Sequence, residues 1–406
     1  MINAAVIGVS GFGAVHCGDL FREHEAGRVN FAAAVIHQNQ VSPEYLERLK
    51  ALNVEIFTDY PSMLAKHAGK LDICCIPTGI ALHRPMTEAA LAAGANVFVE
   101  KPVAPVLADA EAMEAAARKA GKFVAVGYQT IYQPETRRIK EMILSGKLGK
   151  VKRLKCYTLW PRKNAYYGRN GWAGALFNQA GEPVLDSPFT NAVAHYLNLL
   201  LFYAGNTFEG TADVKSVEAG MFRVNPISSC DTADIRVLTK DEKEILFYVS
   251  HAIPATDGPI SDIECEKGTI HYTQQETIVT DLQGNEIERF ASAAGGEIRK
   301  NVWNGLLNRL NDPNGFICTV KLASKAVLVS NAVFDSAPIV DLPASLVDIT
   351  VDDDRNTLRI IRPMEELIKR CYQENRLISS ADLPGAAPTV PFDLENYKGF
   401  TKALYR

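Results

Sequence analysis

The first 125 residues alternate between short apolar runs and amphipathic stretches, and this alternation constrains the fold more than any other feature of the sequence. Residues 4–8 are continuously apolar, apart from the closing glycine, as is typical of a strand buried on both faces of a sheet. Strands that alternate with helices build a parallel sheet with crossover helices. The predicted strands are 4–8, 31–36, 71–76, 96–99 and 123–126, and the predicted helices are 15–25, 43–52, 84–93 and 108–120.

The pattern changes after residue 127, where strand follows strand with short turns, which indicates antiparallel pairing. The predicted strands are 150–160, 216–224, 232–238, 244–250, 261–266, 269–274, 277–281 and 286–290, and the predicted helices are 134–144, 191–202, 298–310, 320–334 and 357–374. The sequence therefore predicts an α/β protein with a doubly wound domain at 1–127. An α+β domain at 128–406 would carry a large, mostly antiparallel open sheet with one face on helices and one face free.

Composition excludes several classes of function. Charged residues make up 22% of the 406, and the net charge is -4, which gives no electrostatic case for nucleic acid or an anionic membrane as a partner. No apolar run reaches the roughly 18 residues of a membrane span, and the first residues lack the features of a signal peptide, so we expect a cytoplasmic protein. The eight cysteines show no CxxC spacing, and no metal site is predicted.

A glycine-rich turn lies between the first strand and the first helix. The segment 8–13 contains Gly8, Ser10, Gly11, Phe12 and Gly13, where a dinucleotide-binding fold needs glycines for a tight turn and a close approach of the backbone to a pyrophosphate. The helix that follows would present its free N–H groups to the phosphates. The sequence thus predicts a Rossmann domain that binds a nicotinamide dinucleotide through these residues, although the middle glycine of the usual pattern is replaced by Ser10.

The end of the second strand distinguishes NAD from NADP in such folds, through an acidic residue for NAD or an arginine for NADP. Here the chain has His37-Gln38-Asn39-Gln40, which offers neither. His37 is a candidate contact for the adenosine ribose, with a solvated loop residue as the alternative. Because no cation is positioned for a 2′-phosphate, NAD is the predicted cofactor, and NADP is not excluded.

At Glu100-Lys101-Pro102 the sequence resembles the Gfo/Idh/MocA family, the glucose–fructose oxidoreductase and inositol dehydrogenase group. The segments 72–83, 126–134 and 264–270 are also similar to that family, and the match covers most of residues 1–290. The resemblance implies a role for Lys101 at both the substrate hydroxyl and the nicotinamide, with a salt bridge to Glu100 as the structural alternative. The other implied cofactor contacts are Pro77, Thr78, His83, Glu100 and Gln129, and Tyr128 is an implied substrate contact.

The family's catalytic motif has Asp, then His four residues later, then Asp three residues after that. The matching residues here are Asn191, His195 and Asn198, so the resemblance retains the histidine and loses both carboxylates. Spacings of four and three place all three side chains on one face of a helix. Histidine is the natural proton acceptor near neutral pH, so His195 is the predicted base, with Asn191 positioning it or the substrate, and Asp186 a possible compensating acid.

Two of the three tryptophans lie in the loop 160–174. Aromatic side chains beside Arg169, Asn170 and Trp172 suit a sugar ring, and loop packing or a dimer contact is the structural alternative for each. The predicted function is hydride transfer between the nicotinamide and a secondary hydroxyl of a sugar, polyol or glycoside. The alternatives are redox-neutral glycoside cleavage or elimination through transient oxidation, and a non-catalytic nucleotide-sensing regulator. The open sheet favours a homo-oligomer, a dimer or tetramer.

Overall fold

The computed structural model describes residues 1–36, 41–386 and 388–405, which divide into two compact units. The first unit comprises Met1–Tyr132 and Gly295–Ser324, and the second comprises Gln133–Ala294 and Lys325–Arg406. The sequence predicts one boundary, between residues 127 and 128. The structure differs from this prediction, because a segment from the second half of the chain belongs to the first unit.

The first unit is built on a six-stranded sheet with the order β3-β2-β1-β4-β5-β6, and every neighbouring pair is parallel. This order, with helices between successive strands, is that of a Rossmann fold. Two short elements, β3 and α3, were not predicted. The elements are β1 (Ile2–Ile7), α1 (Gly13–Glu25), β2 (Val29–Val35), α2 (Pro43–Ala51), β3 (Glu55–Phe57), α3 (Tyr60–Lys66), β4 (Ile73–Ile76), α4 (His83–Ala92), β5 (Asn96–Val99), α5 (Leu107–Ala120), β6 (Val124–Val126) and the 3-10 turn η2 (Gln129–Tyr132).

Helix α9 (Gly295–Asn311) and the residues after it complete this unit. The backbone carbonyl of Cys318 accepts a hydrogen bond from Val126 N at 2.8 Å, so the segment pairs with the exposed edge of β6. The hydroxyl of Tyr132 accepts a hydrogen bond from Cys318 N at 3.0 Å. An edge strand has unpaired backbone groups, and the returning segment satisfies them at β6.

The second unit is built on a ten-stranded sheet whose main path is β14-β13-β12-β11-β7-β10-β9-β8-β15, with β18 also paired to β8. Its strands are β7 (Val151–Leu159), β8 (Val214–Arg223), β9 (Thr232–Thr239), β10 (Glu244–Ser250), β11 (Asp257–Cys265), β12 (Gly268–Tyr272), β13 (Glu276–Asp281), β14 (Glu286–Ala291), β15 (Ile339–Asp341) and β18 (Phe392–Asp393). The pairing is antiparallel as predicted, except that β7 pairs with β10 and β15 pairs with β8 in parallel. The predicted fold class is confirmed.

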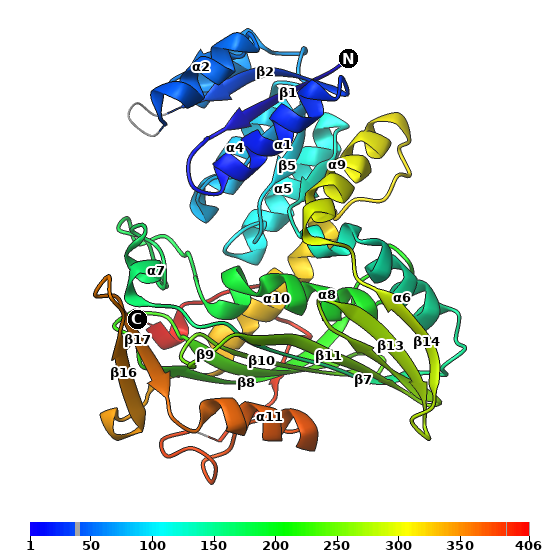
Figure 1. Ribbon diagram of the computed structural model, residues 1–406, viewed down its shortest axis with the longest axis vertical. Coiled ribbons are helices and arrows are strands. Elements are labelled where there is room, and N and C mark those ends of the chain that lie inside the picture. Colours follow the sequence, from blue (N-terminus) through cyan, green and yellow to red (C-terminus); the bar gives the residue numbers. More distant parts are fainter. Residues whose placement is uncertain (37–40, 387, 406) are drawn as a thin grey trace. The chain divides into compact units, whose positions relative to one another are not determined.

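The sheet carries helices on both faces, which corrects the expectation of a free face (Figure 1). Helices α6 (Pro134–Leu144), α8 (Ala194–Ala204) and α10 (Val320–Ser336) lie on one side, and α11 (Met364–Glu374) lies on the other. On the α11 side, apolar side chains of β7, β8 and β10 pack in one cluster with those of the helix; they include Leu159, Phe222, Leu246, Tyr248, Leu367, Ile368 and Cys371. The sequence predicted one helix over 357–374, but its first residues form strand β17 (Thr357–Ile361).

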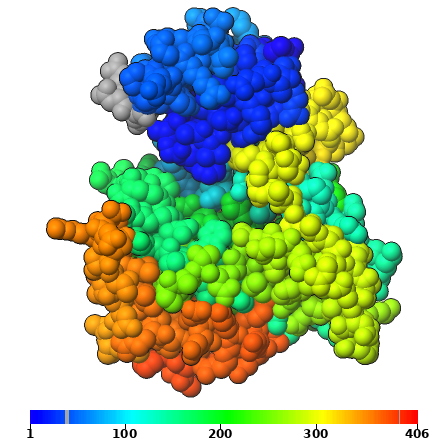
Figure 2. All heavy atoms as spheres, viewed as in Figure 1, coloured from blue at the N-terminus to red at the C-terminus, as the bar shows by residue number. Residues whose placement is uncertain are grey.

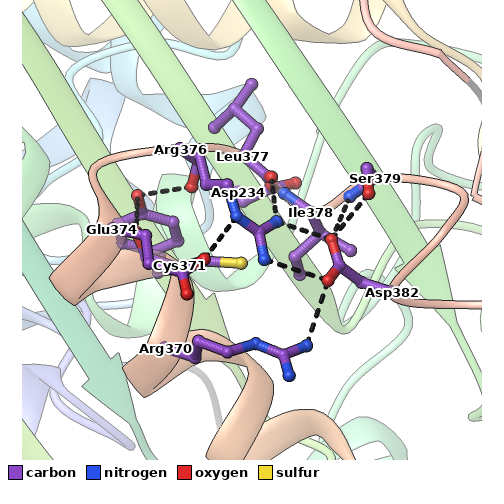
Figure 3. Close-up of polar contacts among 10 residues, drawn as sticks. Asp234, Arg370, Cys371, Glu374, Arg376, Leu377, Ile378, Ser379 and Asp382 are labelled. Carbon is purple, nitrogen blue, oxygen red and sulfur yellow. Dashed lines mark hydrogen bonds and ion pairs between the residues drawn. The ribbon is translucent and has the colours of Figure 1, made fainter.

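The chain after α11 is fixed to the sheet by a polar cluster (Figure 3). Asp382 pairs with Arg376 at 2.5 Å and with Arg370 at 3.0 Å. The fully buried Asp234 of β9 accepts a hydrogen bond from Ile378 N at 2.5 Å. Burial raises the pKa of the Asp234 carboxyl to about 7. This segment therefore covers part of the sheet face that the sequence left open.

A two-stranded hairpin of β16 (Val347–Val351) and β17 (Thr357–Ile361) forms a separate small sheet in the second unit. It contacts the short helix α7 (Asn164–Gly168): Lys163 pairs with Asp352 at 2.6 Å, and Asn164 accepts a hydrogen bond from Thr357 N at 2.8 Å. Figure 2 shows this orange hairpin beside the green loop that contains α7. Among the described residues, no helix combines the length and the apolar character that crossing a membrane requires.

Candidate active site

The glycine turn between β1 and α1 has the geometry that a phosphate-binding loop requires. Gly8 and Gly11 adopt φ values of 97° and 57°, in the left-handed region that favours glycine. A Cβ on Gly13 would lie 2.5 Å from the carbonyl oxygen of Gly8, so no larger residue fits there without a backbone shift. Helix α1 begins at Gly13 behind Phe12, and no side chain caps it. The first three N–H groups of α1 donate to carbonyl oxygens of the turn at 2.9–3.2 Å. The positive end of the helix dipole lies at this turn and favours an anion such as the pyrophosphate of a dinucleotide.

The loop after β4 lies against this turn. A Cβ on Gly8 would lie 3.6 Å from Cγ2 of Thr78, and one on Gly13 would lie 3.6 Å from Cγ of Pro77. His83 is only 1% exposed, and its ring nitrogens lie 3.0 Å from the carbonyl oxygen of Pro102 and 3.1 Å from that of Thr78. Burial lowers the pKa of its imidazole. His83 thus joins two backbone segments, and its contact with the cofactor stays a prediction.

Glu100 organises the start of the loop that carries Lys101. One carboxylate oxygen lies 2.8 Å from Nε2 of the buried His16 and 3.5 Å from Arg299, and the other accepts from Lys101 N at 3.2 Å. Burial alone would raise the pKa of Glu100, but the hydrogen bond with His16 and the positive charge of Arg299 lower it to about 2. Glu100 is thus held as a carboxylate below the protein surface.

Arg299 extends this network to α1. Its guanidinium pairs with Asp19 at 2.5 Å and lies over the rings of Phe12 and Phe98, at 5.8 and 5.6 Å from their centroids. The network therefore joins the glycine turn, the Glu100 loop and α9. Neither Arg299 nor His16 was predicted. His16 lies three residues after Gly13, and this position on the helix could have indicated a role beside the glycine turn. No feature of the sequence indicated that α9 contributes Arg299.

The residues after β6 complete the set in the first unit. Gly127 lies so close to Glu100 that a Cβ there would be 2.7 Å from a carboxylate oxygen. Tyr128, predicted to contact the substrate, is 1% exposed, and burial raises the pKa of its phenol. The structure therefore places its side chain in the core of the first unit. Gln129 begins the 3-10 turn η2 and is half-buried. His37 lies outside the described residues.

In the second unit, Asn191 and His195 are separated by a break in the helix. Asn191 lies in the π turn η3 (Pro188–Ala192), and α8 begins only after Val193, whose φ of -119° interrupts the helical backbone. The prediction of one continuous helical face for Asn191, His195 and Asn198 is therefore wrong. Pro188 and the capping box of Ser187 with Thr190 explain the separate turn, because together they start a new helical segment.

Asp186, which the sequence could not place, lies beside Asn191. One of its carboxylate oxygens accepts from Asn191 Nδ2 at 2.8 Å, and the other accepts from Gly174 N at 2.5 Å. Asp186 is 3% exposed. A carboxylate therefore lies within hydrogen-bond distance of the replaced position. Asn198, the other replacement, is buried in α8, and neither amide atom has a hydrogen-bond partner among the described residues.

The aromatic loop 160–174 packs against the same region. Trp160 lies edge-on to Tyr196 at 6.0 Å between ring centroids. The predicted sugar contacts differ in their surroundings. Oδ1 of Asn170 accepts from the backbone N–H groups of Trp172 and Ala173, which makes it a turn residue. Arg169 is exposed and lies over the ring of Tyr166 at 3.6 Å.

Comparisons with known proteins agree with this geometry. Residues 2–128 match the model of the GFO_IDH_MocA family, described as "Oxidoreductase family, NAD-binding Rossmann fold". The chain is 36% identical over 115 residues to a 1-carboxy-3-chloro-3,4-dihydroxycyclo hexa-1,5-diene dehydrogenase of Comamonas testosteroni. This alignment covers 27% of this chain and 29% of that protein. It is 29% identical over 182 residues to the D-glucoside 3-dehydrogenase of Escherichia coli, 44% of this chain and 47% of that protein. The chain thus spans less than half of either relative.

Among solved structures, the WlbA dehydrogenase from Bordetella pertussis, in complex with NADH and UDP-GlcNAcA, superposes with a TM-score of 0.66. The match has 21% identity and covers 83% of this chain and 96% of that chain, which shows a shared fold over both units. The predicted resemblance and fold are confirmed, and so is the NAD-type cofactor at the level of the family.

Proposed function

We propose that the chain, whose residues 2–128 match the Gfo/Idh/MocA family model, transfers a hydride between NAD and a secondary hydroxyl of a sugar or polyol. The observation that carries the proposal is the turn from Gly8 to Gly13, which has positive φ at Gly8 and Gly11, leaves no room for a Cβ at Gly13, and lies at the N-terminus of α1. The E. coli relative, a D-glucoside 3-dehydrogenase, supports the sugar class of substrate.

The first unit would bind the dinucleotide through the glycine turn, with Pro77 and Thr78 beside the nicotinamide. Bound NAD supplies the hydride acceptor at C4 of its ring. The choice of NAD over NADP rests on the sequence His37-Gln38-Asn39-Gln40, which offers no cation for a 2′-phosphate.

Lys101 would hold the substrate oxygen. Its backbone N–H donates to the carboxylate of Glu100, which His16 and Arg299 hold in turn. These contacts fix the backbone at the start of the loop that carries Lys101. An ammonium hydrogen-bonded to the hydroxyl oxygen stabilises the negative charge that develops as the carbonyl forms. Glu100 acts through Lys101 and is therefore a positioning residue.

His195 would accept the proton of the substrate hydroxyl, while the hydride leaves the carbon that bears this hydroxyl. The products would be a ketone and an imidazolium. Asn191 would orient the substrate or the imidazole. Its amide is itself oriented, because its N–H side donates to the buried Asp186. Asp186 would thus take over part of the role of the replaced carboxylate, by orienting the uncharged amide of Asn191.

The test is turnover of a panel of sugars and polyols, followed by NADH absorbance, with Lys101→Ala and His195→Ala beside the wild type. Loss of a positioned acid–base group costs about 10²- to 10⁴-fold in kcat, and we expect a loss in that range for each variant. NADH binding, measured by fluorescence, should persist in His195→Ala.

Lys119→Ala is the matched control, because Lys119 is an exposed lysine in the last turn of α5 in the same unit. Full activity in both active-site variants would contradict the assignment. Cleavage of a glycoside without accumulation of NADH would replace net dehydrogenation by the redox-neutral alternative.

A further inference from the structure

The loop 160–174 of the second unit holds two guanidinium groups that lack acidic partners. We propose that Arg162 and Arg169 bind an anionic group of the substrate, a carboxylate or a phosphate, so that the enzyme acts on an acidic sugar rather than a neutral one. The inference rests on the proposed function in taking the ligand of this unit to be a sugar.

The two guanidiniums lie over the same aromatic ring. The Cζ atoms of Arg162 and Arg169 are 5.0 and 3.6 Å from the centroid of Tyr166. Arg162 donates to the carbonyl oxygen of Pro161 at 3.0 Å, and Arg169 to that of Tyr166 at 2.7 Å. In the part of the chain that the structure describes, neither arginine forms an ion pair, and Nε of Arg162 is buried without a hydrogen-bond partner.

Many other cations of the second unit differ from this pair in having acidic partners. Lys163, between the two arginines in sequence, is paired with Asp352. Most arginines elsewhere in the second unit are paired with an acid; they include Arg153, Arg223, Arg236 and Arg376. Two like charges over one ring repel each other, and an anion between or beside them would relieve that repulsion.

His251 provides a second, independent indication that this region binds a polar ligand. It is 2% exposed, its Nδ1 lies 2.7 Å from the carbonyl oxygen of Trp160, and its ring centroid is 5.8 Å from that of Tyr166. Burial and the charges of Arg162 and Arg169 lower the pKa of His251 to about 3, so the imidazole is neutral. A neutral ring that donates from Nδ1 keeps Nε2 as an acceptor, and this buried atom has no partner among the described residues.

The cluster is continuous with the candidate catalytic residues of the second unit. Trp160 contacts Tyr196, the neighbour of His195 in α8. The end of the loop is held by Asp186, which accepts from Gly174 N and from Asn191. Asp186 is an acid of this framework, but both its oxygens already accept hydrogen bonds, and neither guanidinium forms an ion pair with it.

These groups match the chemistry of an acidic sugar. The planar guanidinium binds a carboxylate or phosphate through two parallel N–H groups, which a neutral hydroxyl cannot match in strength. The faces of Trp160 and Trp172 suit the apolar face of a pyranose, and Nε2 of His251 suits a hydroxyl. A neutral polyol would leave both cations without a counter-charge.

The experiment compares matched pairs of ligands on the full-length protein saturated with NADH. The probes are D-glucuronate and D-glucose 6-phosphate, each against D-glucose, and binding is measured by calorimetry at low ionic strength. We expect at least one anionic probe to bind roughly 10- to 100-fold more tightly than glucose, the range for hydrogen bonds to charged groups. Glucuronate and the phosphate together separate the two sources of the anion.

Arg162→Gln and Arg169→Gln should each remove most of this preference, measured as the ratio of the affinity for the anionic probe to the affinity for glucose. Arg169 is exposed, so its loss should not disturb folding even where the loss of Arg162 does. Arg289→Gln is the matched control, because Arg289 lies on β14 and pairs with Glu276 and Glu286 at the surface. Lysine at either position should restore only part of the preference, since it keeps the charge without the planar geometry.

Equal binding of the charged and neutral probes, no binding of either charged probe, or an unchanged preference in Arg169→Gln would overturn the anion site. Failure of the proposed function is distinguishable from these results. A wild-type protein that binds glucuronate selectively but oxidises no sugar would contradict the hydride-transfer assignment alone. Turnover of neutral sugars with binding that ignores charge would contradict the anion site alone.

Discussion

At the scale of single residues, the clearest relation between sequence and geometry is that of Gly127 to Glu100. A Cβ at position 127 would lie 2.7 Å from one carboxylate oxygen and 2.8 Å from the other. The carboxylate cannot move aside easily, because His16, Arg299 and the backbone of Lys101 all hold it. Gly127 therefore serves to make room for a buried charge.

We expect Gly127→Ala to destabilise the protein by about 1–3 kcal/mol, the usual cost of forcing extra volume into a packed site. Gly18→Ala is the control, since Gly18 is exposed in α1 and a Cβ there meets no atom within 4 Å. It should stabilise the helix by about 0.5–1 kcal/mol. Urea unfolding of both variants checks the opposite signs, and a Gly127→Ala variant as stable as the wild type would show that Glu100 is free to shift.

At the scale of elements, the region around α8 shows how local sequence divides a helical pattern. The apolar spacing of 191–202 predicts one helix, but the chain forms a π turn and then α8. The capping box at Ser187 and the proline after it start the first segment early, and the backbone turns at Val193 before α8 begins. As a result, Asn191 donates a hydrogen bond to Asp186 and does not share a continuous helix with His195.

The contact between β9 and the segment after α11 should make stability depend on pH. Burial raises the folded pKa of Asp234 from 3.8 to about 7. Between these values the folded protein holds a proton that the unfolded chain has released, so stability falls as the pH rises. Asp234→Asn lacks this dependence and still offers an oxygen to Ile378 N. Relative to the wild type, it should gain about 2–3 kcal/mol between pH 5 and pH 8 in urea unfolding.

Asp382→Asn provides the control of opposite sign for this cluster (Figure 3). The hydrogen bond and charge of Arg376 lower the pKa of Asp382, so its contribution is present at neutral pH and is lost as the pH falls. The variant should be less stable than the wild type at pH 7, with a difference that shrinks in acid. A parallel pH dependence for Asp234→Asn and the wild type would refute the role of Asp234.

At the scale of the whole molecule, the chain leaves the first unit at Tyr132 and returns to it at Gly295. The returning segment supplies Arg299 to the Glu100 network and pairs with the edge of β6. The prediction of a single boundary between residues 127 and 128 did not include this returning segment. The homo-oligomer and the cytoplasmic location stay predictions.

The return predicts that residues 1–132 alone fold poorly. Removing 295–324 leaves Glu100 and Asp19 without Arg299, and a buried charge that loses its partner costs several kcal/mol. A chain in which a flexible linker joins 1–132 to 295–324 should regain a cooperative thermal transition and NADH binding. Circular dichroism and NADH fluorescence measure both, and full stability of 1–132 alone would contradict the role of α9.

The sequence by itself determined the parallel sheet of the first unit, the glycine turn and most strands of the second sheet. Each of these depends on local rules: apolar runs for buried strands, glycine where φ is positive, and short turns for antiparallel neighbours. Only the tertiary structure decided which distant residues meet. Arg299 reaches Glu100, Asp186 reaches Asn191, and α11 covers β7, because such contacts depend on how whole elements pack, and no local pattern encodes that packing.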